Sequence, residues 1–103
     1  MTKAALTGAR VFDGTVFHEN TAVLLSDGCF EAIVPAAEAQ GVNITVLGGG
    51  ILSPGFVDVQ VNGGGSVLFN DQPDSTALQA MAEAHASLGA TRILPTLITD
   101  TRD

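Results

Sequence analysis

Short runs of apolar residues, separated by glycine-containing turns, fill the first half of the chain. Asp13-Gly14 and Asp27-Gly28 each stand between two such runs, and Asp-Gly favours a hairpin because both central residues of that turn need positive φ. A helical turn is expected at residues 36–40, after Pro35. The pattern predicts a small antiparallel sheet, one piece of a β-sandwich, over residues 1–53, with strands at residues 5–12, 16–19, 22–25, 29–34 and 43–47.

The pattern changes at about residue 54. Residues 56–61 (FVDVQV) are apolar at most positions, which indicates a strand buried on both faces, as in parallel sheets and barrels. The loop Asn62-Gly63-Gly64-Gly65 follows. Residues 91–99 (TRILPTLIT) are predicted to form a second buried strand.

A helix is predicted between these two strands. Asp74 or Ser75 can cap its start, it runs to about Leu88, and Gly89 stands where a terminating glycine belongs. One face of this helix is expected to be formed by Leu78, Met81, Ala82, His85 and Leu88.

A strand, a helix and a strand in this order predict a right-handed βαβ unit with parallel strands. Two parallel strands cannot cover both of their faces. We therefore expect an α/β fold in which residues 54–103 begin a TIM-like (β/α)8 barrel that the chain leaves incomplete.

Composition and charge narrow the function classes. The chain is 46% hydrophobic and 15% charged, which argues against disorder. Its formal charge of −7, from 11 acidic and 4 basic residues, disfavours nucleic acids and anionic membrane surfaces as partners. The single cysteine, Cys29, cannot form an internal disulfide, and no leader or bilayer-spanning run is evident, so we expect a cytoplasmic protein.

The candidate site residues lie at the end of the first barrel-type strand. Gln60 and Asn62 are two residues apart, so on a strand they point to the same side. Amides bind Zn²⁺ poorly compared with imidazole or carboxylate. The two side chains can orient water or substrate near a site, or they can simply hydrogen-bond the glycine-rich turn that follows.

Other residues are weaker candidates for a functional site. Asp58 shares the parity of Gln60 and needs a partner if buried, which favours a supporting role over direct catalysis. Gly63 and Gly64 can admit a ligand close to the backbone or form a plain flexible loop. His18 and His85 are poor metal candidates because each stands alone. Thr96 and Thr99 can line a pocket at the end of the second strand, although threonine is common in strands.

Several motifs together resemble a known family. Residues 52–58 (LSPGFVD) resemble the start of the barrel in the amidohydrolase superfamily, where His-x-His ends the first strand. Here Gln60-Val61-Asn62 takes that place, as in one branch of the N-acetylglucosamine-6-phosphate deacetylases. Residues 63–65 (GGG), 68–71 (LFND) and 94–99 (LPTLIT) are similar to that family as well.

The resemblance implies hydrolysis of the acetamide of N-acetylglucosamine 6-phosphate by a metal-activated water. It implies one divalent metal, Zn²⁺ in the first instance, whose ligands and catalytic carboxylate lie downstream, so no catalytic or metal-binding residue is assigned in this chain. Gln60 and Asn62 would lie near the metal and orient water or substrate, or bind the metal weakly. Asp58 would support the barrel mouth, and Gly63 and Gly64 would belong to the pocket loop.

Three hypotheses follow for the 103-residue chain. It is a fragment of a deacetylase that is inactive alone, a half-enzyme that needs a complementary chain, or a binding or structural module on an enzyme-derived scaffold. The open barrel edge also predicts a homo-oligomer.

Overall fold

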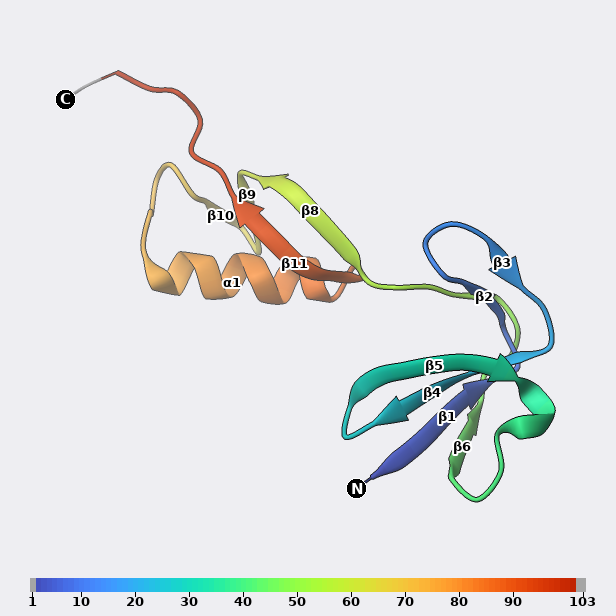
Figure 1. The fold of residues 1–103 in the computed structure, drawn as a ribbon. Helices are drawn as coiled ribbons and strands as arrows, with labels where there is room; N and C mark the ends of the chain where they lie inside the picture. Colours follow the sequence, from blue (N-terminus) through green and yellow to red (C-terminus); the bar gives the residue numbers. More distant parts are fainter. Residues whose placement is uncertain (1, 102–103) are drawn as a thin grey trace. The chain divides into compact units, whose positions relative to one another are not determined.

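The computed structural model describes residues 2–101, which form two compact units divided after Pro54 (Figure 1). The first unit holds β1 to β7 and a 3₁₀ turn, η1; the second holds β8 to β11 and α1. The described residues are thus mostly β structure with one α-helix. The elements are β1 (Lys3–Thr7), β2 (Arg10–Phe12), β3 (Phe17–His18), β4 (Thr21–Ser26), β5 (Cys29–Pro35), η1 (Ala36–Glu38), β6 (Asn43–Val46), β7 (Ile51–Leu52), β8 (Phe56–Val61), β9 (Gly63–Gly64), β10 (Val67–Leu68), α1 (Ser75–Ala86) and β11 (Ala90–Pro95).

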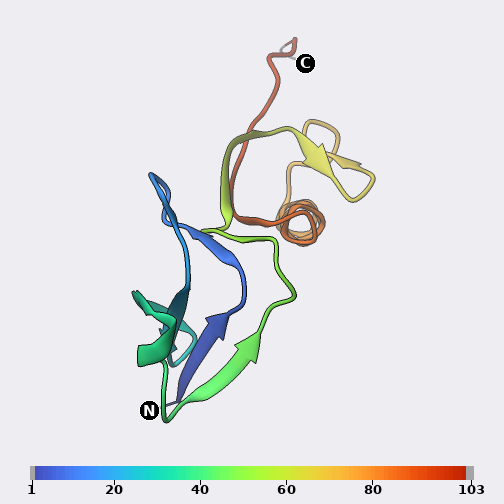
Figure 2. The same ribbon diagram turned by 90° about the vertical axis from the view of Figure 1, so that its right-hand side faces the viewer.

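The larger sheet of the first unit has the order β5-β4-β1-β6. Strand β4 is antiparallel to both β5 and β1, as the hairpin pattern predicts. Strand β6, however, runs parallel to β1, which Figure 2 shows as blue and green arrows pointing the same way. The prediction of a purely antiparallel sheet is therefore wrong, because the chain crosses over through η1 before it returns as β6.

The two Asp-Gly pairs adopt different turns. Asp27 and Gly28 have φ values of 51° and 78°, and Ser26 pairs with Cys29 across the turn. This is the predicted two-residue hairpin with positive φ at both central positions. At Asp13-Gly14 only the glycine has positive φ, and a four-residue loop joins Phe12 to Phe17. There the Asp13 side chain accepts hydrogen bonds from the Thr15 and Val16 amides, so the simple hairpin prediction is wrong in this detail.

The predicted strand over residues 5–12 is divided at Gly8. This residue has φ of +83°, and a Cβ there would lie 2.3 Å from the Leu47 carbonyl oxygen. Strand β1 thus ends in the larger sheet, and β2 begins a second sheet of order β3-β2-β7, in which β2 pairs parallel with β7. Glycine is required here both by the backbone conformation and by the close approach of the neighbouring chain.

Strand β4 shows how the two faces of the larger sheet are used. Ala22 and Leu24 belong to a cluster on one face, together with Ala5 and Ala39. The alternating residues, Val23 and Leu25, border an open apolar hollow of about 440 Å³, which the second sheet and the last residues of the first unit also line. This hollow is lined by Leu6, Val11, Phe12, Asp13, Val23, Leu25, Phe30, Ile33, Leu52, Ser53 and Pro54.

The second unit contains the predicted βαβ arrangement: β8 and β11 are parallel, and α1 connects them. The expectation that both strands are buried on both faces is wrong within this chain. Val61 is buried, but Phe56, Val59 and Leu94 are exposed by more than half. A pair of strands with a single helix leaves most of its surface uncovered.

Helix α1 begins as predicted and ends at Ala86, slightly before the predicted end at about Leu88. The Asp74 carboxylate accepts a hydrogen bond from the Ala77 amide, which caps the first turn. Gly89, with φ of +99°, follows the last turn. The buried residues are Ala77 and Met81, whereas Ala82 and Leu88 of the predicted face are exposed.

Neither α1, with 12 residues, nor any other helix in residues 2–101 has the length and apolar character needed to cross a membrane.

Candidate functional site

The candidate site lies where the parallel strands β8 and β11 end. Asp58 is half-buried on β8, and its Oδ1 accepts a hydrogen bond of 3.1 Å from the Gln60 amide. This bond satisfies the expected need of the carboxylate for a partner. The Gln60 residue is exposed. Asp58 is therefore placed to shape the backbone of the strand just before its end.

Asn62 directly follows β8 and is half-buried. Its carbonyl oxygen accepts a hydrogen bond of 2.8 Å from the Phe69 amide. Its side-chain Oδ1 is buried but receives no hydrogen bond from the described residues. A buried amide oxygen without a donor is costly, so a hydrogen bond from a ligand or from water would stabilise this atom.

The segment after β11 lies against the end of β8. The Thr96 amide donates to the Val61 carbonyl over 2.8 Å, which continues the pairing of the strands. The Thr96 hydroxyl donates to the Leu94 carbonyl, so it supports its own strand end. Thr99 is exposed.

Asn70, which the sequence pattern did not single out by itself, also reaches this place. Its Nδ2 donates to the Ile98 carbonyl, and its Oδ1 accepts from the Ile98 amide, both over 2.8 Å. The only sequence signal was that Asn70 stands within one of the family-like motifs, LFND. Its partner is 28 residues away, which no local periodicity could reveal.

The glycine-rich segment is more ordered than the predicted loop. Gly63 and Gly64 form β9, which pairs antiparallel with β10. His85 of α1 places its Nε2 atom 2.8 Å from the Gly63 carbonyl. Of the two alternatives, a loop without secondary structure is wrong for Gly63 and Gly64, and His85 acts as a structural donor between the helix and this ribbon.

The described residues do not form a metal site of their own. No group of three or more His, Cys, Asp or Glu side chains suited to a metal ion occurs within residues 2–101. The donors on and after β8 are the Asp58 carboxylate and the amides of Gln60 and Asn62, and amides are poor ligands for Zn²⁺. This set does not fit a zinc centre.

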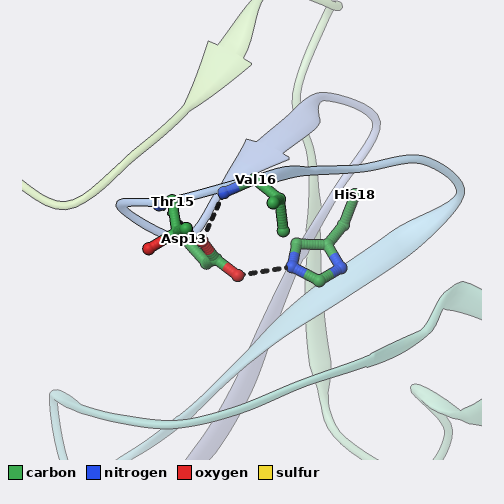
Figure 3. A network of polar contacts seen from close by, with 4 residues as sticks. All are labelled: Asp13, Thr15, Val16 and His18. Atoms are coloured by element: carbon green, nitrogen blue, oxygen red, sulfur yellow. Dashed lines mark hydrogen bonds and ion pairs between the residues drawn. The ribbon is translucent and has the colours of Figure 1, made fainter.

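The first unit contains a polar pair formed by Asp13 and His18. The Asp13 carboxylate lies 2.8 Å from His18 Nε2 and also accepts from the Val16 and Thr15 amides (Figure 3). These bonds, that of His18 first, lower the pKa of Asp13 from 3.8 to about 2. The pair closes the loop between β2 and β3, and His18 remains without a further candidate role.

No protein-family model matches the chain. Individual relatives do. The chain is 42% identical over 98 residues to N-acetylglucosamine-6-phosphate deacetylase of Haemophilus influenzae, a match that covers 94% of this chain and 26% of the relative. It is 38% identical to N-acetylgalactosamine-6-phosphate deacetylase of a Shewanella species, over 90% of this chain and 24% of the relative. The chain thus spans about a quarter of the length of these relatives.

Solved structures agree with this relationship. The fold matches N-acetylglucosamine-6-phosphate deacetylase from Pasteurella multocida with a TM-score of 0.88 and 29% identity, over 96% of this chain and 26% of that chain. It matches the Mycobacterium smegmatis enzyme with a TM-score of 0.80 at 22% identity, which shows the fold alone. Over nearly its whole length, the chain is therefore similar in sequence and in fold to the N-terminal part of N-acetylglucosamine-6-phosphate deacetylases.

Proposed function

We propose that this chain supplies the N-terminal part of a deacetylase that hydrolyses N-acetylglucosamine 6-phosphate to glucosamine 6-phosphate and acetate. The observation that carries the proposal is the 42% identity to a deacetylase over 94% of the chain, which includes Gln60 on β8 and Asn62 directly after it. In such a reaction water adds to the acetamide carbonyl, the C–N bond breaks, and the amine takes up a proton.

The contribution of this chain would be to orient rather than to transfer protons. The buried Oδ1 of Asn62 can accept a hydrogen bond from the attacking water or from an N–H or O–H group of the sugar. Gln60, exposed two residues earlier on β8, can make a similar contact. The carboxylate of Asp58 supports this strand through the Gln60 amide.

The barrel belongs to the same proposal. Strands β8 and β11 are parallel and joined by α1, and both present exposed apolar side chains. Further strands and helices, from a region corresponding to the other three quarters of the relatives, would cover these faces in a (β/α)8 barrel. Polar groups at the carboxyl ends of the strands would then line its mouth.

A divalent metal, Zn²⁺ in the first instance, is part of the proposed activity, but its ligands would have to lie outside the residues described. The donor set of β8 does not fit such an ion, as argued above. The general base would likewise come from elsewhere. On this proposal the 103-residue chain alone has no deacetylase activity.

A second substrate is favoured by the Shewanella relative, which is named for N-acetylgalactosamine 6-phosphate and is 38% identical to this chain. The two sugars differ only in the configuration of one hydroxyl group. Both should therefore be compared in any assay.

The proposal can be tested with a chimera in which this chain replaces the matching 98 residues of the Haemophilus influenzae relative. Acetate release from both sugar phosphates is measured for the chimera, for the chain alone, and for the chain mixed with the remaining part of the relative. We expect activity in the chimera and none in the chain alone. Activity of the mixture would favour a half-enzyme.

A matched pair of variants in the chimera tests the role of the site. Asn62→Ala should lower kcat at least tenfold, whereas Asn43→Ala, on exposed β6 of the first unit, should leave it unchanged. A folded chimera without turnover on either sugar would reject the deacetylase assignment and favour a binding or structural module. Turnover by the isolated chain would reject the view that its catalytic groups lie elsewhere.

A further inference from the structure

We infer that Asn70 is a positioning residue, which fixes the backbone after β11 beside the candidate site by acting as a substitute strand partner. Both polar atoms of its side-chain amide are engaged by the main chain of Ile98. Nδ2 donates to the Ile98 carbonyl and Oδ1 accepts from the Ile98 amide, each over 2.8 Å.

This pattern copies a β-ladder. At each hydrogen-bonded position of an antiparallel pair, two opposed residues exchange one N–H···O bond in each direction. A primary amide side chain offers the same donor and acceptor side by side. Strand β11 ends at Pro95, and among residues 2–101 the pairing with β8 continues through the bond from the Thr96 amide to the Val61 carbonyl. Asn70 takes over two residues later, where β8 has already turned away into β9.

The contact also connects two segments that are each hydrogen-bonded to the end of β8, at Val61 and at Asn62. The residue before Asn70, Phe69, donates its amide to the Asn62 carbonyl, so Asn70 stands on a segment already tied to the end of β8. On the other side, Thr96 is tied to Val61. The Asn70–Ile98 bonds join these two segments directly. The buried Oδ1 of Asn62 belongs to the residue whose own carbonyl and whose preceding carbonyl accept the other two bonds.

In terms of the proposed function, on which this step rests, Asn70 would hold residues 96–98 in place at the mouth that receives the acetamide. It would not touch the reacting atoms. Loss of the contact should therefore loosen the mouth while the two strands remain paired.

Hydrogen exchange in the 103-residue chain tests the contact without any assay of activity. Asn70→Ala removes donor and acceptor, and the protection of the Ile98 amide should fall at least tenfold, whereas the Thr96 amide, bonded to Val61, should change little. Asn43→Asp, which changes an exposed amide of the first unit, is the control. Unchanged protection of Ile98 in Asn70→Ala would overturn the inference.

A pH series with Asn70→Asp separates the two-bond geometry from mere space filling. The ionised carboxylate can still accept from the Ile98 amide, but it has no donor for the Ile98 carbonyl and repels that oxygen, which should push this segment away. The protonated acid has both a donor and an acceptor, as the amide does. Protection of the Ile98 amide, corrected for intrinsic exchange, should therefore recover as pH falls below about 4. Asn70→Ala should show no such recovery, and equal behaviour of the two variants would overturn the inference.

The same variants in the active chimera connect the contact to the reaction. We expect Asn70→Ala to lower kcat about tenfold or more with a smaller change in KM. Unchanged kcat with lost Ile98 protection would reject the positioning role. An inactive parent chimera would instead count against the proposed function, and the exchange experiments would still decide whether Asn70 holds Ile98.

Discussion

The Nε2 atom of His85 lies 2.8 Å from the carbonyl oxygen of Gly63, so one imidazole joins α1 to the glycine ribbon that follows β8. A carbonyl oxygen only accepts hydrogen bonds, so the ring donates from Nε2, which fixes its tautomer when the ring is neutral. The histidine is thus a structural tie next to the candidate site.

Replacement of His85 should destabilise the second unit. We expect His85→Ala to lower the free energy of unfolding by about 1 kcal/mol or somewhat more, since it leaves the partly buried Gly63 carbonyl without its donor. His85→Gln, which keeps an N–H donor, should cost less. Urea unfolding followed by the amide resonances of α1 would measure both, and equal losses would show that the hydrogen bond is not the cause.

The two glycines of β9 should differ in their tolerance of a methyl group. A Cβ at Gly63 would lie 2.3 Å from the Val67 carbonyl oxygen, a backbone atom, whereas at Gly64 it would lie 2.9 Å from His85 Nε2, at the end of a side chain. Gly63→Ala should therefore cost about 1–3 kcal/mol or more and Gly64→Ala less, because a side chain can move aside.

Gly48→Ala serves as the control for this pair, since a Cβ there meets nothing within 4 Å. Its effect should stay within about 0.5 kcal/mol in either direction. The same urea experiment compares the three variants. A Gly64→Ala variant that is less stable than Gly63→Ala would contradict the packing around β9.

The loop between β2 and β3 should weaken in acid. The pKa of Asp13 is lowered to about 2, mainly by the hydrogen bond from His18 and further by the Val16 and Thr15 amides. A depressed carboxyl pKa gives a stabilisation that is complete above the usual value of 3.8 and is lost as pH falls through about 2. His18→Ala should move the Asp13 pKa back toward 3.8, and carboxyl NMR titration would follow it. A value that does not move would show that the backbone amides alone lower it.

The uncovered faces of β8 should make the isolated chain associate. Phe56, Val57 and Val59 of β8 are each exposed by 60% or more, which is unusual for adjacent large apolar side chains. We expect light scattering to detect oligomers that Val59→Lys weakens. Val16→Lys, at an exposed position in the first unit, is the matched control. A clean monomer at high concentration would contradict this expectation.

Local signals in the sequence predicted much of the local structure. The Asp27-Gly28 turn, the Asp74 cap, Gly89 and the βαβ order all follow from backbone preferences of residues near one another. Which strands pair with one another, and in which direction, could not be predicted from these local signals. The pairing of β1 with β6 depends on a crossover, and an apolar strand pattern does not specify its neighbour's direction.

The candidate site was predictable only in part. Asp58 and Gln60 could be placed on one strand from the apolar pattern around them, and Asn62 directly follows that strand. The bonds from Asn70 to Ile98 and from His85 to Gly63 span 28 and 22 residues and use main-chain atoms, which leave no trace in residue type. The ribbon of Gly63 and Gly64 was missed because glycine is a weak strand former.

The central place of β1 in the larger sheet bears on how the first unit assembles. Strand β1 lies between β4 and β6, so the first residues of the chain cannot complete their pairing until Asn43–Val46 has been synthesised. The β4–β5 hairpin is local and can form earlier, whereas the β1–β6 pair requires closure of a long loop, which slows folding. An affinity tag or a deletion that disturbs residues 3–7 would separate β6 from its partner, so tags are better kept away from this strand.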